Sequence, residues 1–190
     1  RGTMLDEYLE EMQPEFSSCV ESFERNLSTV RTGRASPVLL ENVQVDVSTY
    51  GSRMPIKQLA SITAPDARML VVNPWDKGTL KDIERGIMAG GLGLNPNSDG
   101  NIIRVPIPPL TGERRQELKR KVRSLAEDAR IRARRVRKDY NDIIKESEND
   151  KEISEDDSRG YQSRVQDATN SCISQIDQLC LAKEQELDEV

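Results

Sequence analysis

The sequence predicts an α+β protein of two domains. Residues 1–30 and 111–190 form an elongated three-helix bundle, and residues 31–110 form a small module of strands and one helix inserted into it. In three separate segments, apolar residues recur at spacings of three and four, which is typical of helices that bury one face. Most of the prolines and glycines fall between the first two of these segments, where apolar residues alternate instead. Charged residues make up 32% of the chain and aromatic residues 4%, a balance that suits long solvated helices.

The first helical segment carries one apolar stripe, and Pro14 interrupts it. A proline lacks a backbone N–H donor and clashes with the preceding turn. We therefore expect either a kink at Pro14 or a helix whose regular part begins there. The three cysteines show no CxxC spacing, and Cys19 and Cys172 fall on helical stripes, where we expect small buried hydrophobic residues. The first stripe consists of Leu5, Leu9, Met12, Phe16, Val20, Phe23, Leu27 and Val30.

Two further helices complete the predicted bundle. The second is expected from about residue 111 to 147, a length of about 55 Å at 1.5 Å per residue, and it needs partners along that length. The third follows Ser154, a hydroxyl N-cap with three acids in the first turn. The second stripe is Leu118, Val122, Leu125, Ala129, Ala133, Val136, Tyr140 and Ile143; the third is Tyr161, Val165, Ala168, Cys172, Ile176 and Leu179, with Leu187 as a further candidate.

The inserted module is expected to contain strands around residues 43–47, 68–72 and 102–107, and a turn at 97–100. A short helix is expected at 79–89. Thr79 and Asp82 are expected to cap that helix, with Ile83, Ile87 and Met88 on its buried side. Trp75, the single tryptophan, is expected either to pack in the module or to lie at the rim of an interface.

Residues 31–34 and 106–110 connect the module to the bundle, and we call them the two linkers. A glycine permits a left-handed turn after a helix, and prolines stiffen the return path, so the linkers predict a hinge. An ordinary pair of turns fits the same residues. The predicted hinge residues are Arg31, Thr32, Gly33, Arg34, Pro106, Pro108 and Pro109.

Residues 113–138 form a basic segment in an acidic chain. They hold 12 Lys and Arg against 4 Asp and Glu, whereas the whole chain has a net charge of −5. Positive charge gathered in one segment is expected of a surface that binds phosphates. On a helical wheel of ~100° per residue, five of these side chains fall within an arc of about 60°. We call these five the basic edge: Lys119, Arg123, Arg130, Arg134 and Arg137.

Two interpretations of the basic edge stay open. Residues 1–30 carry 2 basic and 7 acidic side chains, and residues 139–190 carry 5 and 15, so the basic helix could simply pair with acidic neighbours. The apolar heptads and the opposite helix charges also fit a structural coiled-coil adaptor acting through protein contacts. The preference for arginine favours phosphate instead, since its planar fork matches phosphate oxygens. Structured RNA, recognised through shape and backbone, is then the expected partner.

The sequence argues against enzymatic chemistry. It contains no histidine, the commonest general base and metal ligand, and the glycines at 90–93 lack the Lys-Ser/Thr of a phosphate-binding loop. We therefore expect no catalytic residues, no cofactor and no metal. No apolar run approaches the ~20 residues that span a bilayer, so no membrane partner is expected. Met4 is expected to be the natural first residue.

Six motifs carry a family resemblance: RTGRASP (31–37), QLASIT (58–63), GLGLNPNSDG (91–100), IRVPIPPLTGERR (103–115), VRKDYND (136–142) and DKEISEDD (150–157). Together they make the chain similar to the ribosome recycling factor family over essentially its whole length from Met4. Two departures are visible. The loop at 48–54 is slightly longer than the usual hairpin, and Gly112 stands where an acid is common.

The resemblance implies an L-shaped molecule, near tRNA in outline, with a three-helix bundle and a β/α/β domain joined by a two-strand hinge. It implies binding to the post-termination ribosome and, with elongation factor G and its GTP hydrolysis, separation of the subunits so that mRNA and tRNA leave. Arg134 and Arg137 match arginines that contact large-subunit ribosomal RNA, and residues 31–34 match the hinge. We expect a cytoplasmic monomer, or one in an organelle's stroma or matrix if a targeting peptide has been removed.

Overall fold

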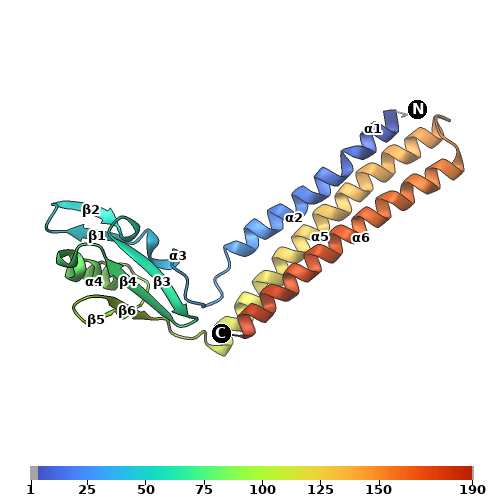
Figure 1. Ribbon diagram of the computed structural model, residues 1–190. Helices are drawn as coiled ribbons and strands as arrows, with labels where there is room; N and C mark the ends of the chain where they lie inside the picture. The colour runs from blue at the N-terminus through green and yellow to red at the C-terminus, as the bar shows by residue number, and fades with distance from the viewer. Residues whose placement is uncertain (1–3, 190) are drawn as a thin grey trace. The chain divides into compact units, whose positions relative to one another are not determined.

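The computed structural model describes residues 4–189, and the chain divides into two compact units. One unit contains the chain up to Arg31 together with Gly112–Glu189, and the other is Thr32–Thr111. Residues 1–3 and residue 190 lie outside the described residues. The expectation that Met4 is the natural first residue concerns residues 1–3. The predicted class, an α+β protein with a three-helix bundle and a small sheet module, is confirmed (Figure 1).

The first unit consists of α1 (Met4–Glu10), α2 (Met12–Ser28), α5 (Gly112–Asn149) and α6 (Glu155–Asp188). The long helices α2, α5 and α6 lie side by side, with α5 antiparallel to the other two (Figure 1). All eight residues of the first predicted stripe are buried, and so are the three cysteines. Burial raises the pKa of the Cys172 thiol to about 11, so this thiol stays protonated at neutral pH.

The interruption expected near Pro14 is confirmed, and it falls at Glu11. Helix α1 ends at Glu10 and α2 begins at Met12. Pro14 has no N–H group to donate to the carbonyl of Glu10 four residues earlier, so the helical ladder is open at this point. The N-cap predicted for the third helix is also confirmed, since the Ser154 hydroxyl accepts the Asp157 N–H at 3.1 Å.

The second unit holds two antiparallel sheets together with short helices. Strands β1 (Gln44–Val47) and β2 (Ser52–Pro55) form one sheet; β3 (Ala60–Asp66), β4 (Met69–Pro74), β6 (Ile103–Pro106) and β5 (Asn97–Ser98) form the other, in that order. The helices are α3 (Val38–Glu41), α4 (Leu80–Ala89) and the short 3-10 helices η1 (Ile56–Gln58) and η2 (Lys77–Thr79).

Alternating residues of the strands and one face of α4 make the core of this unit. Val45, Leu70, Val72, Ile103 and Val105 are fully buried together with Ile83 and Ile87 of α4. Gly86 permits the contact between α4 and β1, because a β-carbon there would lie 2.8 Å from Cγ2 of Val45. The helix therefore packs closer to this strand than a side chain would allow.

Two expectations for α4 are wrong. Thr79 makes no side-chain capping bond; its hydroxyl donates to the Asp76 carbonyl at 2.7 Å, and the Asp76 carboxylate accepts the Gly78 N–H at 2.9 Å. Asp82 is buried and accepts the N–H and hydroxyl of Ser48, so it fastens the β1–β2 turn to α4. Met88 is 62% exposed, because it follows Ile87 by one residue and is rotated about 100° away from the buried face.

Trp75 is 68% exposed, which excludes the packing alternative for this side chain. The nearby Tyr50 hydroxyl donates to the Asp76 carboxylate at 2.8 Å, and Tyr50 is also exposed. None of the helices within residues 4–189 combines the length and apolar character that crossing a bilayer requires.

Candidate functional site

The basic edge lies along α5, beside the stripe that α5 buries in the bundle. Val122, Ala126, Ala133 and Ile144 are fully buried, so the orientation of the whole helix is fixed by packing. The basic edge faces α6, since four of its five members form ion pairs or hydrogen bonds with residues of that helix. Its position therefore follows from the apolar pattern of the sequence.

Three members of the basic edge pair with acids of α6. Lys119 binds Asp188 at 2.6 Å, Arg123 binds Glu184, and Arg130 binds Asp177 at 2.8 Å. Steps of four and seven residues along α5 are matched by equal steps in the opposite direction along α6. This is the register of two antiparallel helices, so for these three residues charge complementarity within the bundle describes what the structure shows.

The other two members have no acid of α6 as a partner. Arg134 binds Glu127 of its own helix at 3.2 Å, and its side chain is 46% exposed. Arg137 donates to the amide oxygen of Gln166 at 3.4 Å, a neutral partner. Among residues 4–189 no carboxylate lies within ion-pair distance of Arg137. The basic edge thus divides into a part that pairs with α6 and a part that keeps donors available.

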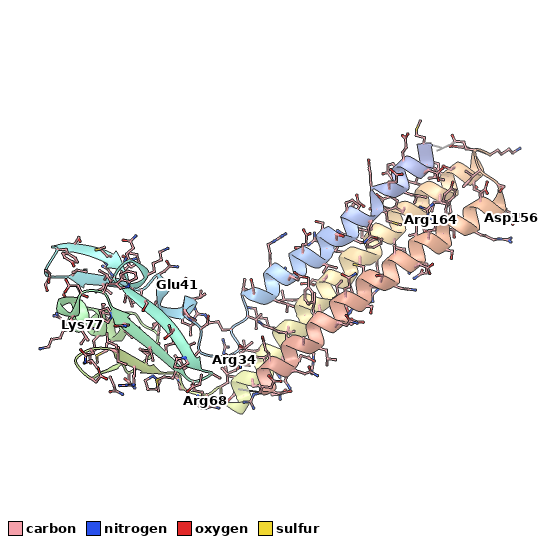
Figure 2. The ribbon with its side chains drawn as sticks, in the orientation of Figure 1. Arg34, Glu41, Arg68, Lys77, Asp156 and Arg164 are labelled. Atoms are coloured by element: carbon pink, nitrogen blue, oxygen red, sulfur yellow. The ribbon has the colours of Figure 1, made fainter. Side chains whose placement is uncertain are left out.

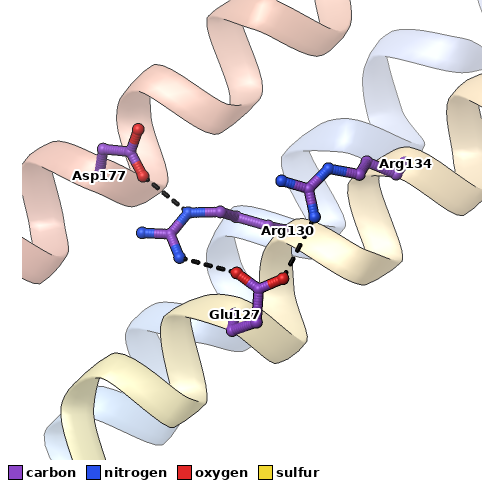
Figure 3. Close-up of polar contacts among 4 residues, drawn as sticks. All are labelled: Glu127, Arg130, Arg134 and Asp177. Carbon is purple, nitrogen blue, oxygen red and sulfur yellow. Dashed lines mark hydrogen bonds and ion pairs between the residues drawn. The ribbon is translucent and has the colours of Figure 1, made fainter. Parts of the chain in front are cut away.

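Glu127 and Asp177 hold the middle of the basic edge in one cluster (Figure 3). Glu127 accepts from Arg130 at 3.1 Å and from Arg134 at 3.2 Å, and these bonds lower the pKa of its carboxyl group. Partial burial works against the charged form of Arg130, but its bonds to Asp177 and Glu127 prevail and raise its pKa. The cluster therefore places two guanidinium groups beside two carboxylate groups.

Further basic side chains on α5 lie outside the arc that defined the basic edge. Arg120, Lys121 and Arg135 are exposed on the side away from the buried stripe, and within the described residues none of them forms an ion pair. The Arg132 guanidinium donates to the Ser22 hydroxyl at 2.9 Å. A single arc of the helical wheel does not include these residues; the wider criterion of every basic residue opposite the apolar stripe includes the first three.

The residue after the first linker and a residue of the second linker are hydrogen-bonded to the same turn of the second unit. The Ala35 N–H donates to the Ala67 carbonyl at 2.7 Å, and the Ile107 N–H donates to the Arg68 carbonyl at 2.8 Å. Residues 67 and 68 connect β3 to β4, and Arg34 and Arg68 lie at the same end of the unit (Figure 2). The linker segments beyond these bonds are short, so any hinge is confined to a few residues on each side.

The predicted hinge residues differ in backbone conformation, in exposure and in whether they belong to the sheet. Gly33 has a φ of 76°, the left-handed conformation expected of it. Arg31, Arg34, Pro108 and Pro109 are exposed and Thr32 is half-buried. Pro106 is the last residue of β6, opposite Met69 of β4, so it belongs to the sheet and the second linker begins after it.

Three acids lie in the first turn of α6, where Ser154 caps the helix. Across the described part of the chain, no three acidic or sulfur ligands gather closely enough to hold a metal ion.

Comparison with known proteins gives a consistent result. The family model described as ribosome recycling factor matches residues 23–187. The chain is 47% identical to the ribosome-recycling factor of Carboxydothermus hydrogenoformans, covering 97% of this chain and 98% of that protein. It is 46% identical to that of Geobacillus sp., covering 98% and 100%.

Two solved structures have a fold similar to that of this chain. A solution structure of the ribosome recycling factor covers all of both chains at 37% identity, with a TM-score of 0.67. The T. thermophilus ribosome recycling factor, described with E. coli elongation factor G on the E. coli post-termination complex, matches with a TM-score of 0.59 and 40% identity over 97% of this chain and 99% of that one.

Proposed function

The chain belongs to the ribosome recycling factor family, and we propose that it binds the post-termination ribosome and, together with elongation factor G, separates the subunits so that mRNA and tRNA are released. Support for these partners comes from the related T. thermophilus factor, which is described with elongation factor G on a post-termination complex. The observation on this chain that carries the proposal is the pair Arg134 and Arg137, two arginines of the basic edge that α6 leaves without a carboxylate partner.

Arg134 and Arg137 are proposed to bind phosphates of large-subunit ribosomal RNA. A guanidinium presents five N–H donors, and the contacts shown use one on Arg134 and one on Arg137. The remaining donors match the oxygens of a phosphate group. A regular helix offers no element that reads base edges, so the contact is one of backbone and shape. Lys119, Arg123 and Arg130 contribute mainly by holding α5 against α6.

The second unit is proposed to transmit force through the two linkers. Because the linkers are fastened to the β3–β4 turn by Ala35 and Ile107, motion between the units is confined to about three or four residues of each linker. Elongation factor G hydrolyses GTP and moves the second unit, while the bundle stays bound to RNA. In this mechanism the chain acts as a monomer and carries out no chemistry of its own.

The adaptor alternative loses one of the two observations that motivated it, the opposite charges of neighbouring helices; the other was the apolar heptads. Within this chain Lys119 pairs with Asp188, Arg123 with Glu184 and Arg130 with Asp177. No partner protein is needed to explain them.

Subunit separation tests the proposal directly. Post-termination ribosomes are mixed with the protein, elongation factor G and GTP, and splitting is followed by light scattering and by sedimentation. We expect rapid splitting that requires all three components and is weakened by Arg134→Ala together with Arg137→Ala. Splitting at the same rate without the protein would overturn the proposal, and an undiminished rate with the double variant would overturn the assigned contact.

A further inference from the structure

Glu127 is the acid that binds Arg134, one of the two arginines of the basic edge that have no carboxylate partner on α6. One carboxylate oxygen accepts from Nη1 of Arg130 at 3.1 Å, and the other accepts from Nη1 of Arg134 at 3.2 Å (Figure 3). Both oxygens are therefore in use. The carboxylate lies between two guanidinium groups that are four residues apart on α5, on the side of the helix where the proposed RNA contact is made.

The two arginines differ in what else holds them. Arg130 is 23% exposed and has a second acid, Asp177 of α6, so it stays in place without Glu127. Arg134 is twice as exposed, and among residues 4–189 Glu127 is the carboxylate shown within ion-pair distance of it. Glu127 thus acts on Arg134 chiefly, while Arg130 and Asp177 keep the carboxylate itself in position.

A carboxylate and a phosphate compete for the same guanidinium donors. When a phosphate approaches Arg134, it must either displace Glu127 or sit beside a carboxylate of like charge. Both outcomes weaken binding to any phosphate. Arg137 carries no such penalty, because its contact is the neutral amide of Gln166.

We propose that Glu127 is a specificity-determining residue that lowers the affinity of Arg134 for RNA phosphates in general. The inference rests on the proposed function, since it assigns Arg134 to an RNA contact. An arbitrary RNA strand that reaches Arg134 alone meets the full competition from Glu127. A structured surface that also engages Arg137 binds through several contacts and overcomes it, so the presence of Glu127 favours the correct RNA over others.

The test compares Glu127→Gln with Asp128→Asn. Both variants remove one negative charge from adjacent exposed positions of α5, and only Glu127 contacts the basic edge. Affinity is measured at several low salt concentrations for oligo(U), an unstructured RNA, and for vacant large ribosomal subunits. We expect Glu127→Gln to tighten oligo(U) binding about two- to five-fold more than Asp128→Asn does, with a smaller gain on the ribosomal subunit.

Two further variants keep the outcome decisive. In an Arg134→Ala background the gain from Glu127→Gln should disappear, and Glu127→Ala should act in the same direction as Glu127→Gln, with circular dichroism reporting an intact bundle in each case. Equal effects of the Glu127 and Asp128 changes, weaker binding by Glu127→Gln, or a gain that persists without Arg134 would each overturn the inference. If Arg134→Ala alone leaves ribosome binding unchanged, the proposed RNA contact is wrong, and the inference falls with it.

Discussion

A β-carbon added to Gly33 would lie 2.6 Å from Cγ of Leu110. The first linker therefore packs against the second at Gly33, which has no side chain. Gly33 also has a φ of 76°, which glycine adopts without strain. Two independent demands, on conformation and on space, therefore fall on the same residue. At the other glycines of this unit either the conformation or the space requires glycine, but not both, so the two effects can be measured separately.

Replacing Gly33 by alanine should destabilise the second unit by about 1–3 kcal/mol, since a non-glycine residue in the left-handed region is strained and Leu110 must also move. Gly93→Ala is the matched control. Gly93 has a φ of 68° with open space around it, so it reports the conformational strain alone. Urea unfolding of the two variants measures both, and equal losses would mean that the contact with Leu110 adds nothing.

The same position tests the role of the linkers. Gly33→Pro should preserve ribosome binding better than it preserves subunit splitting, because the RNA contact lies on α5 and the proposed motion passes through the linkers. Binding is measured by sedimentation with ribosomes and splitting by light scattering with elongation factor G and GTP. An equal loss of both activities would argue against a mechanical role for the linkers.

Gly86→Ala should destabilise the second unit by about 1–3 kcal/mol, although alanine favours a helix by about 1 kcal/mol over glycine. The added β-carbon would lie 2.8 Å from Cγ2 of Val45 and 3.1 Å from the Gln44 carbonyl, so α4 and β1 must move apart. Gly160→Ala in α6 has no atom within 4 Å and should be stabilising. Thermal unfolding measures both; a stabilising Gly86→Ala would show that α4 and β1 separate at little cost.

Helical periodicity predicted those features of the fold that depend on a single segment of the chain. Every residue of the first stripe is buried, and Ser154 caps the helix that it was predicted to start. The role of Gly86 was not predictable in this way, because the demand for a small residue comes from Val45 in another element. Asp82 is a second case: its position in the first turn of α4 suggested a cap, but Ser48 lies close enough in space to take its carboxylate.

The basic edge shows the same limit at the candidate site. Its five residues follow from a helical wheel, whereas their partners depend on the register between α5 and α6. In the observed register Arg130 binds Asp177, whereas Arg137 contacts the neutral Gln166. Sequence charge counts cannot distinguish these positions, so they leave both interpretations of the basic edge open.

Acid should weaken the second unit through Asp99. Its carboxylate accepts the N–H groups of Ile102 and Asn101 at 3.0 Å each and binds Arg104 at 2.9 Å, and these bonds lower its pKa from 3.8 to about 2. The folded state therefore holds the ionised form more strongly than the unfolded state does. This stabilisation is complete above about pH 4 to 5 and is lost as the pH falls through about 2.

The measurement is an NMR titration of the Asp99 carboxyl carbon together with urea unfolding between pH 2 and pH 6. Asp99→Asn should be less stable than the parent at pH 6 and should lose less stability on acidification. A titration midpoint near 3.8 for Asp99 would show that the turn bonds do not favour the charged form.

Arg123→Ala should reduce stability more than Arg134→Ala does, whereas Arg134→Ala should reduce RNA affinity more. Arg123 pairs with Glu184, whose side chain is only 17% exposed, so its loss leaves a largely desolvated carboxylate unpaired and should lower the free energy of unfolding by about 1 kcal/mol. Arg134 pairs with the exposed Glu127, and its loss should cost well under that amount.

In ribosome binding the order of the two variants reverses. Arg134→Ala should weaken affinity and reduce the slope of log K against log salt by roughly 1, which corresponds to the loss of one phosphate contact. Urea unfolding and binding at several salt concentrations, with affinity expressed per folded molecule, separate the two quantities. If both variants reduce the salt slope equally, Arg123 also contacts RNA, and the division of the basic edge between bundle and RNA would have to be abandoned.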